Sequence, residues 1–390
     1  MKKVRLEFGE TGKDISQSLS ALVHIGDSIY AAGDEGINLI RLQECKEGKR
    51  FKFEQLIPLN DWFDLPIPPS NNDSDGKKAR IIEIDLEGMD FDRKNHLLWM
   101  VGSHSLKRGR ALAELETDQN KERLTEVNSD ANRFFLGYIK LKQEHNKKFR
   151  FPENKKNNDK KNKGTKYKKH AAQLECTSTS SELLDEIGRD PLFARFCLRG
   201  DGVPGKDNGV DIEGLACAPK GRVLVGMRGP VLRGTAIILE LAPERIDSPK
   251  TQADRLQLAK IGPNGLKYRR HFLDLAGHGI RDLCWHGDDL LILAGPTTGL
   301  DSPPLIFRWK KAIKALGEDS SQEEKFIWRA KDSLMLEQDS GRWIQFEPGT
   351  DHAEAIMLLD KQSLLVGYDS PSTKRYKKPA TVIVDVIALK

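Results

Sequence analysis

The sequence predicts an all-β protein, a β-propeller of about five four-stranded blades with a few inserted helices. Three observations favour this fold. A short unit recurs along the chain, in which an apolar run, a turn and a second apolar run end in glycine. One position of this unit carries an acid in most copies. The usual spacing of the copies, roughly 70 residues, fits a four-stranded blade with its loops. A β-sandwich does not repeat a hairpin at constant phase.

The clearest copy of the unit occupies residues 210–234. Asp211 and Glu213 begin its first apolar run, a turn follows at Pro219, and a second run ends at Gly226. Two short buried strands joined by a tight turn account for this pattern. Four other copies follow the same plan and end on Gly33, Gly102, Gly295 and Gly367.

Alignment of the five copies places one residue of each in a common column. The column consists of Ser20, Glu87, Glu213, Asp282 and Glu354. The interval from the column to the closing glycine is the same in four copies and slightly longer in the copy with Glu87. Neighbouring column residues are evenly spaced, except that the step from Glu87 to Glu213 is nearly twice as long as the others. This long step therefore holds either an insertion or a sixth blade that has lost the motif.

The segments between the repeats are expected to complete the blades. Residues 4–8 alternate in polarity and are predicted to complete the last blade, which would join the two ends of the chain. Further strands are expected at 37–42, 51–59, 134–141, 236–241, 269–275 and 380–387. Helices are expected at 110–127, 182–196 and 310–316.

Composition bounds the class of protein. The chain has 390 residues, of which 38% are hydrophobic and 31% charged, so one large core under a very polar surface is expected. No apolar run reaches the roughly 18 residues of a membrane span. The first ten residues lack the apolar region of a signal peptide, which predicts a cytoplasmic protein, although a mature secreted form stays compatible with the sequence.

The five cysteines are scattered and form no C-x-x-C pair, which argues against a zinc knuckle or a redox pair. Cys217 and Cys284 lie within apolar runs and are expected to be core thiols.

A lysine-rich segment interrupts the repeats. Within a single propeller domain, 1–390, residues 142–181 are predicted to form a disordered insertion. Residues 140–169 hold 13 Lys or Arg and three acids, a net charge of +10 in a chain of net charge +5, so the remainder carries about −5. The segment is either a solvated insertion or a contact for polyanions through counterion release. It lacks interleaved aromatic residues between 152 and 164, so sequence-specific nucleic-acid binding is not expected.

Several motifs resemble one family of bacterial proteins. Residues 206–215 (KDNGVDIEGL) and 227–234 (MRGPVLRG) carry the resemblance, and 102–108 (GSHSLKR) and 352–355 (HAEA) match the same pattern. The chain resembles the domain of unknown function 3616 family over nearly its whole length. The resemblance implies a β-propeller-like fold and no established reaction. The lysine-rich insertion is longer and more basic than the family pattern implies.

The acid column suggests a site at the axis. The innermost strand of a propeller blade lines the axial channel, so Glu87, Glu213, Asp282 and Glu354 are expected to face one another at its mouth. Close carboxylates repel strongly. One solution is a divalent cation, above all Ca²⁺, which accepts 6–8 oxygen ligands. The other is a network of ion pairs with Arg228, Arg233 and Arg281, and the sequence leaves both open.

Residues after the closing glycines should gather at the same mouth, among them Asp34. His104 and His352 are candidate catalytic bases there. Arg228 is a candidate clamp for a phosphate or carboxylate, and Lys206 and Asp369 are further candidates for substrate contacts.

Two functions remain. The first is a divalent-cation-dependent hydrolase of an ester or phosphoester, with the site at the mouth of the axial channel and an anionic substrate. The second is a non-catalytic propeller that binds a ligand or a protein, with the channel acids in structural salt bridges. Propellers host many functions, so the fold does not choose between them.

Overall fold

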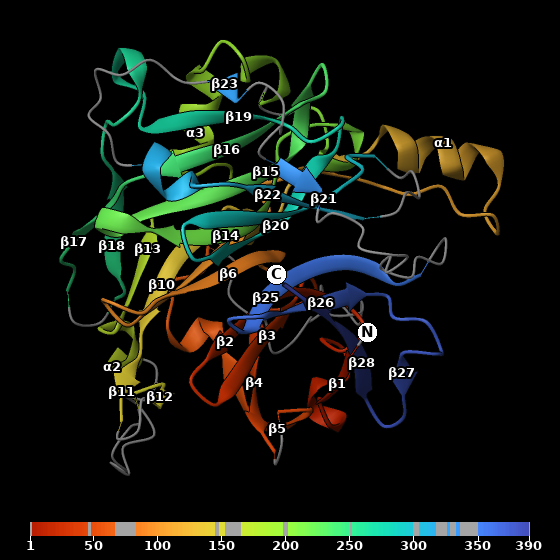
Figure 1. Ribbon diagram of the computed structural model, residues 1–390. Coiled ribbons are helices and arrows are strands. Elements are labelled where there is room, and N and C mark those ends of the chain that lie inside the picture. The colour runs from red at the N-terminus through yellow and green to blue at the C-terminus, as the bar shows by residue number, and fades with distance from the viewer. Residues whose placement is uncertain are drawn as a thin grey trace.

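The computed structural model describes most of the chain. The described ranges are 2–45, 48–66, 83–144, 148–152, 165–197, 202–249, 252–298, 304–316, 326–327, 333–335 and 350–389. Strands dominate throughout these ranges, and Figure 1 shows them arranged as stacked sheets. The all-β prediction is confirmed.

Each sequence repeat forms the first two strands of a sheet. The first blade contains β2 (Leu19–Ile25), β3 (Ser28–Gly33), β4 (Asn38–Glu44) and β5 (Arg50–Pro58). The second contains β6 (Leu86–Asp92), β7 (Leu97–Gly102), β10 (Leu136–Lys140) and β13 (Ala171–Leu174). The third contains β14 (Asp211–Ala218), β15 (Arg222–Leu232), β16 (Thr235–Leu241) and β19 (Tyr268–Asp274).

The last two blades follow the same plan. The fourth contains β20 (Gly279–His286), β21 (Asp289–Gly295), β22 (Leu305–Trp309) and β24 (Ser333–Met335). The fifth contains β25 (His352–Asp360), β26 (Ser363–Asp369) and β28 (Thr381–Ala388), with the short β27 (Tyr376–Lys377) beside β28. Further short strands extend outer edges, β17 (Pro243–Ile246) with β18 (Asp254–Leu258), and β23 (Phe326–Ile327).

The innermost strands close a ring. Among the described residues, β2 contacts β6, β6 contacts β14, β14 contacts β20, β20 contacts β25, and β25 returns to β2. In Figure 1 the strands β6, β14 and β20 cross the middle of the molecule side by side. A closed ring of inner strands is the defining feature of a β-propeller.

The first strand joins the two ends of the chain. β1 (Lys2–Glu7) pairs antiparallel with β28 and so becomes the fourth strand of the fifth blade. It also pairs parallel with β5 of the first blade, and β1, β5 and β28 lie in the lower part of Figure 1, with the N-terminus beside β28. The prediction for residues 4–8 is confirmed.

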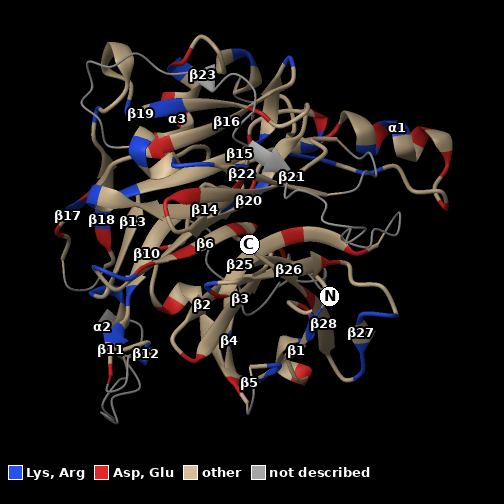
Figure 2. Ribbon diagram, viewed as in Figure 1, with Lys and Arg blue, Asp and Glu red and all other residues tan. Residues whose placement is uncertain are grey.

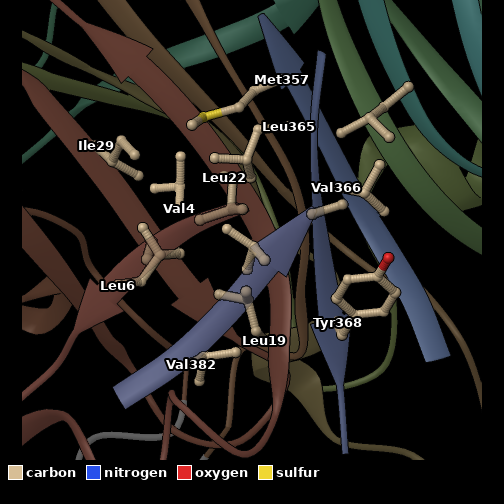
Figure 3. Close-up of a cluster of buried hydrophobic side chains, with 14 of the residues drawn as sticks. Val4, Leu6, Leu19, Leu22, Ile29, Met357, Leu365, Val366, Tyr368 and Val382 are labelled. Carbon is tan, nitrogen blue, oxygen red and sulfur yellow. The ribbon is translucent and has the colours of Figure 1, made fainter. Parts of the chain in front are cut away.

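The core is divided among the gaps between neighbouring blades. Figure 3 shows the cluster between the first and fifth blades, where Val4 and Leu6 of β1 meet Val382 of β28, and Leu22 of β2 lies near Leu365 of β26. All of these side chains are buried. Burial of each is worth about 1.5–3 kcal/mol, so this cluster is a major reason why the ring stays closed.

The helices are short and peripheral. α1 (Thr117–Thr125) buries no residue, projects from the body in Figure 1 and carries mixed charges in Figure 2. It is shorter than predicted because β8 (Lys107–Arg108) and β9 (Val127–Asn128) pair at its base. α3 (Glu182–Arg189) begins at the cap residue Ser181 and packs Leu183 and Ile187 into the core. The helix expected at 310–316 is only a 3-10 turn, Ala312–Ala315.

The lysine-rich segment is more ordered at its ends than predicted. β11 (Lys142–Gln143) pairs with β12 (Phe149–Arg150), and α2 (Thr165–Lys168) leads to β13, a full member of the second blade. The predicted insertion 142–181 is therefore corrected at both ends, because apolar side chains such as Phe149 pack into the core. Residues 145–147 and 153–164 lie outside the described residues.

No helix in the described part of the chain is long and apolar enough to cross a membrane.

Candidate functional site at the mouth of the axial channel

A β-bulge lies at the start of every inner strand. In each blade the pairing of the first two strands shifts by one residue or more at the repeat column. The residues left at or within these bulges are Ser20, Glu87, Glu213, Arg281 and Glu354. A bulge re-aims a side chain out of the regular alternation. The five bulges therefore form the structural counterpart of the sequence column.

The fourth member of the column differs from the prediction. Ile280 pairs with Ala294 and Asp282 with Leu293, so the unpaired residue is Arg281 rather than Asp282. The sequence alignment assumed a constant interval between column and closing glycine, whereas Arg281 lies one position further from Gly295 than Asp282 does. The column thus contains three acids and one arginine, which changes its charge balance.

Asp282 links the fourth and fifth blades by a hydrogen bond. Its Oδ1 accepts a hydrogen bond from Leu283 N and its Oδ2 accepts one from Ile356 N of the next inner strand, both at 2.7 Å. In the second blade, Gly88 occupies the position that corresponds to Asp282, directly after the bulge. The neighbouring inner strand is so close there that a Cβ on Gly88 would lie 2.7 Å from Leu215 N, which leaves no room for a side chain. Burial raises the pKa of Asp282 well above its usual value. With both oxygens engaged by backbone N–H groups, Asp282 is poorly suited to bind a metal.

Two arginines neutralise the column acids Glu213 and Glu354. Arg281 Nη1 lies 2.6 and 2.7 Å from the two carboxylate oxygens of Glu354 and 3.3 Å from Glu213 Oε2. Arg228 Nη1 lies 2.5 Å from Glu213 Oε1 and 3.4 Å from Asp211 Oδ2. Arg228 is 5% exposed, and its Nε is buried without a hydrogen-bond partner among the described residues. These contacts form the ion-pair network that the sequence left open.

The network differs from the predicted one in its third arginine. Arg233 is exposed in the turn between β15 and β16. Arg133 takes part instead, with its Nη1 3.0 Å from Asp85 Oδ2 and its Nη2 bonded to Glu83. Nothing in the repeat pointed to Arg133, because it lies outside the hairpins, in the 3-10 turn before β10.

Two carboxyl groups at the mouth have no basic partner in the described part of the chain. Glu87 makes no hydrogen bond or ion pair with any described residue, and burial together with the charges of Glu213 and Asp85 raises its pKa well above its usual value. Asp34 follows β3, and its Oδ1 is buried without a partner among the described residues. Burial and the charges of neighbouring acids raise the pKa of Asp34 to about 7. Desolvation and like charges disfavour the ionised form of both groups.

His352 and Asp369 lie at the rim of this cluster. They are cross-strand partners in β25 and β26, and His352 Nδ1 is 3.8 Å from Asp369 Oδ2. The pKa of His352 is raised, chiefly by its interaction with Asp369. Both residues therefore stand at the predicted mouth, with His352 two positions from Glu354 along the strand.

His104 and Lys206 do not join the cluster. His104 is 1% exposed, and its Nδ1 lies 2.9 Å from Gly102 O, so Nδ1 carries the proton and donates it to this carbonyl. Burial lowers the pKa of His104 to about 4, and no charged group contributes to this shift. Lys206 is exposed in the 3-10 turn Gly205–Asp207. His104 is a neutral buried residue and Lys206 a surface residue.

The predicted set of four metal ligands does not fit a calcium ion as it stands. Glu213 and Glu354 are bonded to arginines and Asp282 to backbone N–H groups, so within the described residues Glu87 alone of the four offers free oxygens. Across the described ranges, no group of three or more His, Cys, Asp or Glu residues is arranged to hold a metal ion. Calcium binding stays a prediction.

Comparisons with solved structures give weak similarities over almost the whole chain. A protein of unknown function from Dyadobacter fermentans is 11% identical with a TM-score of 0.37, over 100% of this chain and 98% of that one. The PQQ-bound aldose sugar dehydrogenase from Streptomyces coelicolor is 10% identical with a TM-score of 0.35, over 95% of each chain. A glucose dehydrogenase-like putative oxidoreductase from Thermus thermophilus is 13% identical with a TM-score of 0.34, over 95% and 97%. The ring of inner strands, rather than these values, defines the fold.

Among proteins with curated descriptions, none matches this chain. The family model described as "Protein of unknown function (DUF3616)" matches residues 18–385, which span all five repeats. The sequence motifs at 206–215 and 227–234 form β14, β15 and the turn before them, at the centre of the ring. The chain belongs to the DUF3616 family.

Proposed function

We propose that this protein is a ligand-binding propeller that holds a small cation at the mouth of its axial channel, between Asp34 and Glu87. The observation that carries the proposal is the absence of a basic partner for these two carboxyls in the described residues, while Asp85, Glu213 and Glu354 each pair with an arginine. The arginine pairs are structural in this proposal, and the two remaining carboxyls bind the ligand.

Protons and a cation compete for the same two groups. Without a ligand, burial and neighbouring acids raise the pKa values of Asp34 and Glu87, which favours the protonated form of both carboxyls. A cation that enters between them lowers both pKa values and releases protons. Its affinity should therefore increase as the pH rises through about 7.

Two kinds of cation share this chemistry. Ca²⁺ accepts 6–8 oxygen ligands in irregular geometry, and Asp34, Glu87, Asp369 and backbone carbonyls at the mouth would supply some of them. An organic ammonium group needs fewer partners and is satisfied by two carboxylates. The two carboxyls are common to both.

A thermal-shift series tests the proposal. The wild-type protein is melted with calcium chloride and, separately, with methylammonium chloride, at pH 6 and pH 8, with sodium chloride at equal ionic strength as reference. A bound cation at one hundred times its Kd adds about 2.7 kcal/mol to the free energy of unfolding. The shift should be larger at pH 8 and should disappear in the double variant Asp34→Asn, Glu87→Gln.

The matched control is Asp118→Asn in the exposed helix α1, which should respond as the wild type does. If only one of the two salts, calcium chloride or methylammonium chloride, raises the melting temperature, that salt identifies the kind of cation that binds. If neither salt shifts the melting temperature beyond sodium chloride, or if the double variant still responds, the cation site is wrong. Elemental analysis of the purified protein with and without chelator adds an independent reading.

A cation-dependent hydrolase of an ester or phosphoester is the second candidate, and one observation favours it. His352 stands beside Asp369 with a raised pKa at the rim of the same mouth, which suits a general acid. Hydrolysis of p-nitrophenyl acetate and p-nitrophenyl phosphate, with and without calcium, tests this candidate. His352→Gln should remove any activity, and activity that survives this change would exclude His352.

A further inference from the structure

A cavity occupies the other end of the axial channel. Its volume is about 660 Å³, within the range of small-molecule sites. All five inner strands line it with the residues that come after their bulges and before their hairpin turns. The cavity is therefore separate from the acidic mouth, which the beginnings of the same strands form.

The wall of the cavity combines apolar, sulfur-containing and aromatic side chains with polar groups, among them Asp90, which accepts hydrogen bonds from Cys217 N and Phe91 N. Its members include Met89, Phe91, Cys217, Cys284, Trp285 and Met357. The indole Nε1 of Trp285 donates to Cys217 O at 2.7 Å, which fixes this ring across the gap between β14 and β20. Methionine and aromatic side chains adapt to flat apolar ligands.

The two thiols act as apolar surface. Cys217 and Cys284 are partly buried and pack against the core, and both also line the cavity. Burial raises the pKa of each thiol, so neither is a thiolate at neutral pH. Nucleophilic and metal chemistry requires the thiolate. The cavity is thus a binding surface in character.

The rim of the cavity carries two exposed cations beside one carboxylate, Asp92. Arg93 and Lys94 are exposed in the hairpin between β6 and β7, and neither pairs with a carboxylate among the described residues. The neighbouring acid Asp92 is engaged by Lys94 N, Asn95 N and Asn95 Nδ2. Arg93 also lies over the ring of Phe91 at 6.0 Å, so the cation and the apolar wall adjoin.

An orphaned polar atom lies in the same wall. His24 lines the cavity, and its Nε2 is buried without a hydrogen-bond partner in the described part of the chain. Burial and the charge of Arg93 lower the pKa of His24, against a smaller opposite effect of the backbone of Leu358 and Leu359, so the ring is neutral at neutral pH. Unpaired polar atoms of this kind are costly when buried.

We propose that this cavity binds a small amphipathic anion, an aromatic or aliphatic body with one carboxylate or sulfonate group. The apolar body lies against Trp285 and the methionines, and the anionic group meets Arg93 and Lys94 at the rim. The cations Arg93 and Lys94 at the rim favour an anionic ligand in this cavity. A cationic ligand would instead bind at the acidic mouth.

Two fluorescent probes that differ in charge test the proposal. The anionic probe is 8-anilinonaphthalene-1-sulfonate and the neutral probe is N-phenyl-1-naphthylamine. The native protein should bind each at one site with increased fluorescence. The double variant Arg93→Ala, Lys94→Ala should weaken the anionic probe roughly tenfold and leave the neutral probe unchanged. Lys121→Ala in α1 is the matched control for loss of an exposed basic residue.

A second variant tests the location. Ala218 lines the cavity, and Ala218→Trp should fill it and block both probes while circular dichroism confirms the fold. The proposal is overturned if the native protein binds neither probe, or if the rim variant affects both probes or neither. It is also overturned if a folded Ala218→Trp protein still binds both. These outcomes do not depend on the cation site, because Asp34→Asn, Glu87→Gln should bind both probes as the wild type does.

Discussion

The two ends of the axial channel are built from the same five strands and differ in chemistry. At the mouth, the bulges bring charged side chains together, and arginines offset most of the acids. At the hairpin end, a few residues further along the strands, the wall mixes apolar and sulfur-containing side chains with polar ones, and Arg93 and Lys94 lie at the rim. The difference shows that the bulges are what bring the acids of the column together at the mouth.

The mouth should also be the more fragile end. Its charges are buried and held by specific partners, so removing one leaves another without compensation. The hairpin end contains exposed cations and apolar contacts that tolerate change individually. The following predictions test this contrast, from the largest expected effect to the smallest.

Removal of the arginine in the column should have the largest effect. Arg281→Met leaves Glu354 without a basic partner and takes one from Glu213. The free energy of unfolding should fall by about 4 kcal/mol, as for other buried ion pairs with one partner removed. Urea denaturation measures it, with exposed Arg233→Met as control at less than about 0.5 kcal/mol. Equal effects of the two changes would contradict the network.

Removal of the Asp282 carboxylate, which links two blades, should have the second largest effect on stability. Asp282→Ala deprives Leu283 N and Ile356 N of their acceptor. Two buried N–H groups without partners should lower the free energy of unfolding by about 3 kcal/mol. Urea denaturation again measures it, and Asp92→Ala in the exposed hairpin should cost less. A value within error of zero would show that the blades close without this carboxylate.

Glu213→Gln separates the ion-pair network from a calcium site. The substitution keeps the size of the side chain but removes the charge that Arg228 and Arg281 share. Stability should fall by about 2 kcal/mol, equally with and without calcium. A variant that is as stable as the wild type without calcium, and that loses a calcium-dependent increment, would instead place Glu213 on the cation.

Removal of the unpaired carboxyl of Asp34 should increase the free energy of unfolding, in contrast to the three preceding changes. Burial raises the pKa of Asp34 to about 7, so the folded protein holds this proton more tightly than the unfolded chain does. The stability due to this group is complete at low pH and is lost as the pH rises from about 4 to about 7. Asp34→Asn should therefore stabilise the protein, by about 1 kcal/mol more at pH 8 than at pH 5 after discounting for solvent screening.

Guanidinium denaturation at the two pH values measures this difference, in the absence of added divalent cations. Asp118→Asn, which is exposed in α1, should show no such pH dependence. A larger stabilisation at pH 5 than at pH 8 would mean that Asp34 is ionised by a partner in the folded protein.

The thiols at the hairpin end should give the smallest effect. Burial raises the pKa of Cys217 and Cys284, so alkylation by iodoacetamide should be slow at pH 7.5 and increase up to pH 9 or beyond. Mass spectrometry of the modified peptides measures the rates, with Cys45 as the reference thiol because it follows the exposed end of β4. Faster reaction at Cys217 than at Cys45 would show a thiolate in the cavity.

Local pattern determined much of the fold. Alternating apolar runs and turn residues are set within about 15 residues of sequence, so all five hairpins and the closing strand at residues 4–8 were predictable. The same pattern identified Glu87, Glu213 and Glu354 as residues at the mouth. It failed at Asp282, because the distance from bulge to glycine is not constant and an arginine was not expected in an acidic column.

The partners of those acids were decided by the tertiary structure alone. Arg281 meets Glu354 from a different blade, 73 residues away, and Arg133 meets Asp85 from outside the repeat. Closure of the ring brings these groups together, and no local pattern encodes which charge will face which. The sequence by itself determined the repeat and its acids. Only the folded ring decided that arginines neutralise most of them, that Asp34 and Glu87 remain, and that a cavity lies at the other end, because each depends on distances between strands that are far apart in the chain.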